Sequence, residues 1–294
     1  MKKLPVFFHI PRSGGTYVYG MMLLLLRLYG ARKWMPIRPD LWNDNLKIIH
    51  VSDEEQQEIC YIIVNDFDCR HNEGLFRKID QFTSSCSLPD FTDYYNKYNV
   101  EIFSVVITPH GVPIHGSLCS YFEDLTGHSL VRFMTLRDPF QRASSVFKYL
   151  NAAVSVHEPT HRSIRSKTFS EYINLSEQED NLVVRMLCNI SDNQQVSDDN
   201  YKQAEDMISS FMISKTENVD SLLNEVFSEC YDELTTVSCI ENHRLGKQIP
   251  DVNKNQSKSI VIDDLSDHTV AKFIEANKYD QRLYEKYTKD LQHS

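Results

Sequence analysis

The sequence lacks the features that define several common classes of protein. Its seven cysteines are scattered, odd in number and without a Cys-x-x-Cys pair, which argues against a disulfide framework or a zinc site. No cluster of His, Cys, Asp or Glu has the spacing of metal ligands. The apolar run from Met21 to Leu26 is shorter than the about 20 residues needed to cross a bilayer. We therefore expect reduced thiols in a cytoplasmic protein, without a metal and without a membrane segment.

An excess of positive charge is also missing. The formal net charge of the 294 residues is -10, which argues against a general nucleic-acid or heparin binder and leaves a polyanionic partner only a local basic patch. The composition, 41% hydrophobic and 24% charged, is ordinary for a globular protein. A single α/β domain over residues 1–294 fits this length, and no internal repeat or low-complexity tract is present.

The stretch from Pro5 to Tyr17 has the pattern of an anion-binding turn. The apolar run Val6 to Ile10 predicts a buried strand, and an apolar helix is expected from Tyr17 to about Tyr29. Backbone N–H groups at a helix N-terminus, reinforced by the helix dipole, bind phosphate groups. Glycines allow close approach of the backbone, while hydroxyls and an arginine add donors. The candidate residues are Arg12, Ser13, Gly14, Gly15, Thr16 and Tyr17. An ordinary strand-to-helix turn is the alternative interpretation.

The same stretch departs from the loop of nucleoside-triphosphate enzymes. That loop has the form Gly-x-x-x-x-Gly-Lys followed by Ser or Thr, with the hydroxyl on magnesium. Here the turn is shorter and contains no Gly-Lys pair. An ATPase or kinase is therefore disfavoured.

A second motif follows the expected strand Leu130 to Leu136. It reads Arg137-Asp138-Pro139, and a helix is expected from about Phe140 to Val154, with the proline in its first turn. Arg137 and Ser145 are eight positions apart, so the strand end and the second helical turn could hold one phosphate from two sides. A structural Arg–Asp pair with an unrelated helix serine is the alternative.

Three further strands complete the expected sheet. Short strands are expected over Ile48 to Val51 and Ile59 to Val64, and a continuous β-branched run from Val100 to Thr108 is typical of a strand covered on both faces. The last of these runs into Pro109-His110-Gly111. Because ligands of open α/β sheets bind outside the carboxyl ends of strands, His110 is a candidate site residue.

Two other segments receive a structural interpretation. The polar, basic stretch 157–168 has no hydrophobic periodicity and is expected to be a mobile insert near the site or a solvated linker. Apolar residues near the C-terminus recur at helical spacing and predict one long closing helix with a core-facing stripe. The residues of this stripe are Phe273, Ile274, Leu283, Tyr284 and Tyr287.

Both phosphate motifs resemble those of a known enzyme family. The string His-Ile-Pro-Arg-Ser-Gly-Gly-Thr resembles the 5′-phosphosulfate loop of sulfotransferases, with Arg12-Ser13 where Lys-Thr is frequent. Residues 137–145 match every fixed position of the family's 3′-phosphate motif, Arg-Asp-Pro-x-x-Arg-x-x-Ser. Looser likeness to the heparan sulfate 2-O-/6-O-type carbohydrate sulfotransferases extends over residues 180–188, 204–217, 251–258 and 277–285. Within 204–217 a helix is expected from Ala204, followed by a strand from Phe211 to Glu217.

The resemblance implies a fold and a set of site residues. The fold would be P-loop-like, with three layers and a central parallel sheet flanked by helices. The donor would be 3′-phosphoadenosine-5′-phosphosulfate (PAPS), which leaves as 3′-phosphoadenosine-5′-phosphate, and no metal is required. Arg12 would stabilise charge on the bridging oxygen, and Arg137, Ser145 and either Lys254 or Ser257 would hold the 3′-phosphate.

The acceptor and the general base are less closely defined. By the resemblance, the acceptor is a carbohydrate hydroxyl, and the Pro109 to Gly116 segment supplies His110 as the base that takes its proton, with His115 next. His9 is expected inside the first strand, in the core. Alternatives are sulfation of a small polar natural product, a non-catalytic nucleotide- or glycan-binding module on the same fold, and a kinase-like phosphotransferase. Neither the acceptor nor the oligomeric state follows from fold class.

Overall fold

The computed structural model describes residues 3–22 apart from 16 and 19, 33–34, 46–52, 58–64, 96, 101–107, 112–152, 168–175, 180–190, 194–231 and 265–288. Within these ranges the strands are β1 (Leu4–Phe8), β2 (Lys33–Trp34), β3 (Leu46–Ser52), β4 (Glu58–Val64), β5 (Glu101–Ile107), β6 (Leu130–Leu136) and β7 (Met212–Lys215). The helices are α4 (Val112–Thr126), α5 (Pro139–Ala152), α7 (Phe169–Leu175), α8 (Leu182–Cys188), α9 (Asp198–Ile208), the 3-10 turn η3 (Thr216–Asn218), α10 (Val219–Cys230), α12 (Asp267–Ala276) and α13 (Lys278–Thr288).

The described strands form one sheet in the order β2-β3-β4-β5-β1-β6-β7. Every neighbouring pair from β4 to β7 is parallel, so β1 lies inside a block of five parallel strands. The prediction of a parallel sheet is therefore confirmed for this block. It is wrong at one edge, where β2, β3 and β4 pair antiparallel.

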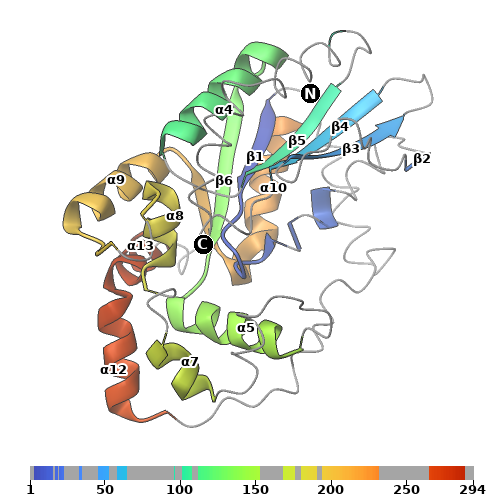
Figure 1. The fold of residues 1–294 in the computed structure, drawn as a ribbon. Coiled ribbons are helices and arrows are strands. Elements are labelled where there is room, and N and C mark those ends of the chain that lie inside the picture. Colours follow the sequence, from blue (N-terminus) through green and yellow to red (C-terminus); the bar gives the residue numbers. More distant parts are fainter. Residues whose placement is uncertain are drawn as a thin grey trace.

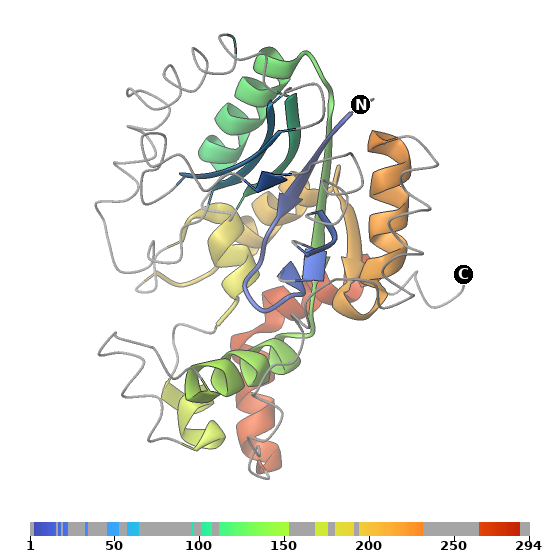
Figure 2. The ribbon, with the colours of Figure 1, turned by 90° about the vertical axis from the view of Figure 1, so that its right-hand side faces the viewer.

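Helices cover both faces of the sheet (Figures 1 and 2). Alternate residues of a strand point to opposite faces, and β1 follows this rule. Leu4, Val6 and Phe8 pack in one core cluster with residues of α4, α8, α9 and α13. Phe7 packs in a second cluster with α10 and with the helical residues that follow the first turn. Since both faces of β1 are covered, its sequence is apolar throughout, as expected for a central parallel strand.

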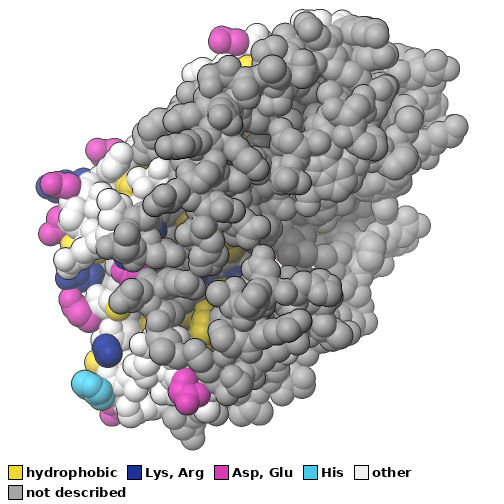
Figure 3. Space-filling view, in the orientation of Figure 1, with side chains coloured by type: hydrophobic (Ala, Val, Ile, Leu, Met, Phe, Trp, Pro, Cys, Tyr) yellow, Lys and Arg dark blue, Asp and Glu magenta, His cyan; other side chains and the backbone are white. Residues whose placement is uncertain are grey.

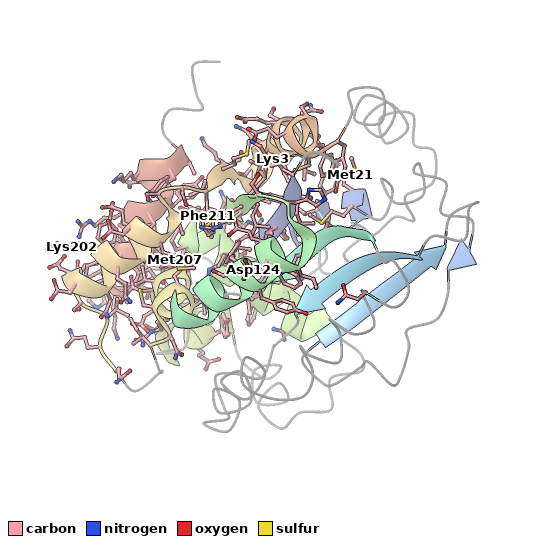
Figure 4. All side chains as sticks on the ribbon, turned by 90° about the horizontal axis from the view of Figure 1, so that it is seen from above. Lys3, Met21, Asp124, Lys202, Met207 and Phe211 are labelled. Atoms are coloured by element: carbon pink, nitrogen blue, oxygen red, sulfur yellow. The ribbon has the colours of Figure 1, made fainter. Side chains whose placement is uncertain are left out.

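The sequence analysis expected helix α9 only from Ala204 onward and missed helix α10 on the opposite face, although each carries a recognisable signal. At the start of α9, Ser197 and Asn200 form a reciprocal capping box. In Figure 4, Lys202 lies on the outer side of α9, while Met207 and Phe211 lie toward the sheet. Helix α10 buries apolar residues at helical spacing. These residues are Leu222, Leu223, Val226, Phe227 and Cys230.

The closing segment differs from its prediction. It forms two helices, α12 and α13, which are separated at Asn277. Phe273 and Leu283 are buried as expected, in different core clusters. Ile274 was expected in the core but is 50% exposed, so that prediction is wrong. The break at Asn277 changes the direction of the chain, and one periodic stripe therefore cannot continue through both helices.

The other predictions on organisation concern membrane segments, metal ligands, surface charge and the segment 157–168. No helix within the described residues is long and apolar enough to cross a membrane. The same residues contain no group of three His, Cys, Asp or Glu that could hold a metal ion. On the face drawn in Figure 3, acidic and basic side chains of the described surface are interspersed. The proposed insert at 157–168 lies outside the described residues except for Thr168, and the single domain stays a prediction.

Candidate anion-binding site

The turn after β1 has an unusual backbone. Strand β1 ends at Phe8, and the chain becomes helical at residue 15. Arg12 and Gly14 both have positive φ, 65° and 84°, whereas Ser13 between them does not. A positive φ is uncommon outside glycine, and such alternation of backbone conformation forms concave nests of N–H groups that bind anions. Arg12 thus adopts a strained conformation at the point where the sequence predicts an anion.

The carbonyl groups of this turn are turned toward the neighbouring strand. The Thr135 hydroxyl on β6 donates to the Ser13 carbonyl, and Arg137 Nη1 donates to the Arg12 carbonyl at 3.3 Å. Within the described residues, the N–H groups of Gly14 and Gly15 have no hydrogen-bond partner. Carbonyl oxygens repel an anion, so a turn with its carbonyls engaged and its amides unpaired is prepared to bind one.

Two buried side-chain groups at the same place also lack partners among the described residues. Ser13 is only 1% exposed, and its hydroxyl has no hydrogen-bond partner there. The Nε of Arg137 is likewise buried and unpaired. Buried polar groups are nearly always paired in native proteins, and an unpaired one costs about 1–3 kcal/mol. Two such donors beside unpaired amides indicate a site for an acceptor-rich ligand.

The two sequence motifs meet in space. Arg12 Nε donates to the Ser145 hydroxyl on α5 at 3.3 Å, across 133 residues of chain. Together with the bond from Arg137 to the Arg12 carbonyl, this contact joins the turn to Arg137 and Ser145 of the second motif. The parallel pairing of β1 with β6 explains the proximity, because the carboxyl ends of parallel strands lie at the same edge of a sheet.

Each fixed position of the second motif has a separate physical role. Arg137 reaches the turn, and Asp138 accepts from the backbone N–H of Gln141 at 3.0 Å, which caps α5. Pro139 occupies the first helical position, where its missing N–H costs nothing. Arg142 is 1% exposed and interacts electrostatically with Asp280 of α13. Arg142 therefore serves the packing of α5, while Arg137 and Ser145 face the site.

The end of β7 contributes a residue that the sequence analysis missed. Thr216 donates through its hydroxyl to the Leu136 carbonyl at 3.1 Å. A Cβ atom at Gly14 would lie 3.2 Å from the Thr216 methyl group and 3.8 Å from the Thr135 hydroxyl. Gly14 is therefore required both by its positive φ and by this close approach. Thr216 has no signal in the sequence beyond its position after a short strand.

His9 is placed differently from its prediction. It is half-buried and follows β1, so the expectation that it lies inside the strand is wrong. Its ring stacks on Phe7 with centroids 5.8 Å apart, and it fills the space beside Gly15. Burial, and secondarily the positive charge of Arg12, lowers the pKa of His9 from 6.5 to about 4. The imidazole is therefore neutral at physiological pH.

Tyr17 was predicted to contact the ligand, and the structure gives its hydroxyl another partner. The hydroxyl donates to the Asp220 carboxylate near the start of α10. This bond links the helix after the turn to α10 on the same face of the sheet. Tyr17 thus lies beside the site and supports it from one side.

Several predicted residues cannot be placed. Thr16, His110, Lys254 and Ser257 lie outside the described residues. His115 belongs to α4, whose first residue follows the segment that contains His110, but its side chain is not described. The structure therefore brings together Arg12, Ser13, Gly14, Gly15, Arg137 and Ser145. Comparison with known proteins adds nothing to this assignment, since no protein-family model and no curated protein sequence matches the chain.

The described side chains supply binding and electrostatic stabilisation. Arg12 and Arg137 bring two guanidinium groups to one edge of the sheet. Free amides and hydroxyls beside them suit an anion with several oxygen acceptors. The arrangement can bind a phosphorylated or sulfated ligand through two separate groups.

Proposed function

We propose that the protein is a PAPS-dependent sulfotransferase that transfers a sulfuryl group to a hydroxyl of an acceptor, which we take to be a carbohydrate. The observation that carries the proposal is the contact between Arg12 and Ser145. It unites a turn that resembles the 5′-phosphosulfate loop with a helix that resembles the 3′-phosphate motif. A ligand with phosphate groups at both ends of a nucleoside would use both halves of such a site.

The unpaired donors fit this ligand. The amides of Gly14 and Gly15 and the Ser13 hydroxyl would bind the 5′-phosphosulfate, and the fold would be P-loop-like in this respect. Arg137 and Ser145 would bind the 3′-phosphate, with Lys254 or Ser257 as further contacts. PAPS would supply the sulfuryl group, and no metal is needed for the transfer. Arg12, at the turn, would stabilise negative charge that develops on the bridging oxygen.

Proton removal is assigned to a histidine. A hydroxyl acceptor must lose its proton as the new sulfur–oxygen bond forms, and neutral histidine suits this role near pH 7. We propose His110 as the base, because it follows a strand whose carboxyl end lies beside that of β1. A cytoplasmic location is part of the same proposal, and cell fractionation tests it.

Ligand binding tests the donor assignment. In calorimetric titrations of the purified full chain, 3′-phosphoadenosine-5′-phosphate should bind at least tenfold more tightly than AMP, and more tightly than ATP with magnesium. Charge-assisted hydrogen bonds of about 1.5–3 kcal/mol each provide this preference. Equal affinity for AMP and the bisphosphate would refute a 3′-phosphate site, and tighter binding of ATP with magnesium would favour a phosphotransferase.

Turnover separates an enzyme from a binding module on the same fold. Purified protein with labelled PAPS is screened against carbohydrate and small polar hydroxyl acceptors, and products are read by the mass of one added sulfuryl group. His110→Ala should lower turnover by about 10²–10⁴ without changing bisphosphate affinity. His268→Ala, an exposed change on α12, serves as the matched control. Tight bisphosphate binding with no transfer to any acceptor would favour the binding module.

A further inference from the structure

The two adjacent glycines of the turn are required for different reasons. Gly14 has φ of 84°, a conformation that side chains rarely adopt, and it also approaches Thr216. Gly15 does not have a positive φ, so its backbone conformation is open to any L-residue. The turn would therefore tolerate a larger residue at Gly15 on conformational grounds alone. Something other than backbone conformation excludes a side chain there.

That obstacle is the ring of His9. A Cβ atom built on Gly15 would lie 2.0 Å from Nε2, 2.2 Å from Cδ2 and 2.9 Å from Cε1 of His9. Distances below 3.0 Å do not occur for real Cβ atoms, so either the ring or the turn would have to move. The ring also stacks on Phe7, whose own ring packs against Phe133 of the core, and these contacts resist its movement. Movement of the turn is then the expected response to a side chain at Gly15.

We propose that His9 is a positioning residue, whose ring packs against Gly15 and fixes the backbone amides of the turn for the 5′-phosphosulfate group. This inference rests on the proposed function for the identity of the ligand. The residue acts through Gly15 and needs no contact with the donor. The lowered pKa of His9 agrees with the geometry, because a neutral ring packs beside Arg12 without repulsion.

A double-mutant cycle tests the proposal. The proteins are the wild type, His9→Ala, Gly15→Ala and the double variant, and the ligands are 3′-phosphoadenosine-5′-phosphate and adenosine 3′-phosphate. Gly15→Ala should weaken binding of the bisphosphate at least tenfold, since the turn must shift. Adding His9→Ala should restore affinity to within about threefold of His9→Ala alone, because the obstacle is gone. Adenosine 3′-phosphate, which lacks the 5′-group, should bind the four proteins with affinities that differ by less than about threefold.

Two controls make the outcome specific. Gly14→Ala should not be rescued by His9→Ala, because its positive φ and its contact with Thr216 are independent of the ring. His268→Ala should leave both affinities unchanged. Failure of His9→Ala to rescue Gly15→Ala, or equal weakening of both ligands, would overturn the proposal, since a merely structural role predicts no selectivity for the 5′-group.

Failure of the proposed function would give a different result. If the wild type binds neither nucleotide, the sulfotransferase assignment is refuted, and the positioning of a 5′-phosphosulfate falls with it. Thermal unfolding of the same four proteins still reports on the contact between His9 and Gly15. A higher Tm for the double variant than for Gly15→Ala would then retain the steric pair as a structural feature. No difference in Tm would refute the pair as well.

Discussion

Two regions of the molecule contain buried polar groups, which lack hydrogen-bond partners within the described part of the chain in one region and are hydrogen-bonded in the other. One is the anion-binding turn, where donors are unpaired. The other is the junction of α8 with α13, where the side chains of Asn181, Asn277 and Asp280 are buried. At the junction, Asp280 accepts from the amides of Val183 and Val184 at 2.9 and 3.0 Å. This carboxylate caps the start of α8.

The asparagines of the junction are equally well paired. Asn181 donates to the Ala276 carbonyl, and its side-chain oxygen accepts from the amides of Tyr279 and Asp280. Its backbone N–H donates to Asn277, whose own amide group donates to Phe273. Every one of these bonds joins parts of the chain that the fold itself brings together. The side chains of Asn181, Asn277 and Asp280 are therefore paired within the protein itself.

The turn is less uniformly buried, with Ser13 buried and Gly14 and Arg137 half-buried, and its polar groups are paired differently. Its carbonyl oxygens are engaged, but the Ser13 hydroxyl, Arg137 Nε and the amides of Gly14 and Gly15 are not, within the described residues. Buried polar groups that satisfy each other specify a structure, and those that remain unsatisfied reduce stability until something binds. Pairing, more than burial, thus distinguishes a structural polar cluster from a binding site.

The largest expected effect is at the junction. Asp280→Ala should lower the free energy of unfolding by about 3–5 kcal/mol, because it leaves Arg142 buried without its acidic partner and removes two hydrogen bonds. Urea unfolding measures this loss, with exposed Asp267→Ala as control. The folded fraction should bind the bisphosphate with the same relative preference for its 3′- and 5′-phosphates as the wild type. Selective loss of the 3′-phosphate preference would show that the junction belongs to the site.

Arg137→Ala should have the next largest effect, on binding. Loss of a charge-assisted contact of about 1.5–3 kcal/mol predicts weakening of bisphosphate binding by tenfold or more, and a smaller change for AMP. Stability should change little, since one of the removed groups is unpaired. Arg282→Ala, on the exposed side of α13, is the matched control. A large drop in stability with unchanged affinity would assign Arg137 to the scaffold.

Ser13→Ala should separate the two properties most clearly. It removes an unsatisfied buried hydroxyl, so the free energy of unfolding should rise by up to about 1 kcal/mol. The same change should weaken bisphosphate binding about threefold to tenfold, because the bound ligand loses the hydrogen bond that the Ser13 hydroxyl would donate. Exposed Ser228→Ala should alter neither quantity. If Ser13→Ala destabilises the protein and leaves affinity intact, the hydroxyl has a structural partner and the comparison fails.

The smallest expected effect is on the pH dependence of stability, to which Asp280 at the junction and His9 at the turn contribute with opposite signs. Burial raises the pKa of Asp280 from 3.8 to about 6. The positive charge of Arg142 and the hydrogen bonds from the amides of Val183 and Val184 lower this pKa, but their effect is smaller. Between these values the folded state holds a proton that the unfolded state releases, so this contribution to stability falls as pH rises. For His9, with its pKa lowered from 6.5 to about 4, the unfolded state binds the extra proton, and stability rises with pH.

Because the two contributions have opposite signs, a variant that removes one group should reveal the contribution of the other. Each contribution is at most about 3 kcal/mol between pH 4 and 6.5, and they largely cancel in the wild type. His9→Gln should make stability fall with rising pH across this window, and Asp280→Asn should make it rise. Unfolding free energies measured at several pH values check both slopes. Parallel slopes in the two variants and the wild type would mean that neither group titrates as described.

The sequence was sufficient to predict the central part of the fold. Continuous apolar runs predicted β5 and β6 to within a residue or two, because buried parallel strands need apolar residues on both faces. Residues 12–15 and 137–145 were each predicted to bind a phosphate from their residue pattern, and the resemblance to sulfotransferases implied that they form one site. The contact between Arg12 and Ser145 joins them. The antiparallel edge could not be predicted, since pairing direction depends on chain connections that leave no local pattern.

Other features depend on contacts between distant residues. The role of Arg142 requires Asp280, which lies on a different helix and in no motif. The pair of His9 and Gly15 depends on the direction of a side chain that the sequence assigned to a strand interior. The break at Asn277 depends on the hydrogen bond that its side chain accepts from Asn181. In each case a local pattern gave the residue, and only tertiary structure gave its partner.

The hydrogen bond from Arg137 to the Arg12 carbonyl makes the two ends of the site a single thermodynamic unit. A guanidinium drawn toward a ligand at one end changes the energy of the backbone at the other, and linkage requires the reverse influence to be of equal size. Inorganic phosphate in the turn and a nucleoside 3′-phosphate on α5 should consequently alter each other's affinity. With the proposed nucleotide bound, the turn would respond to the far end of a ligand that it does not touch there.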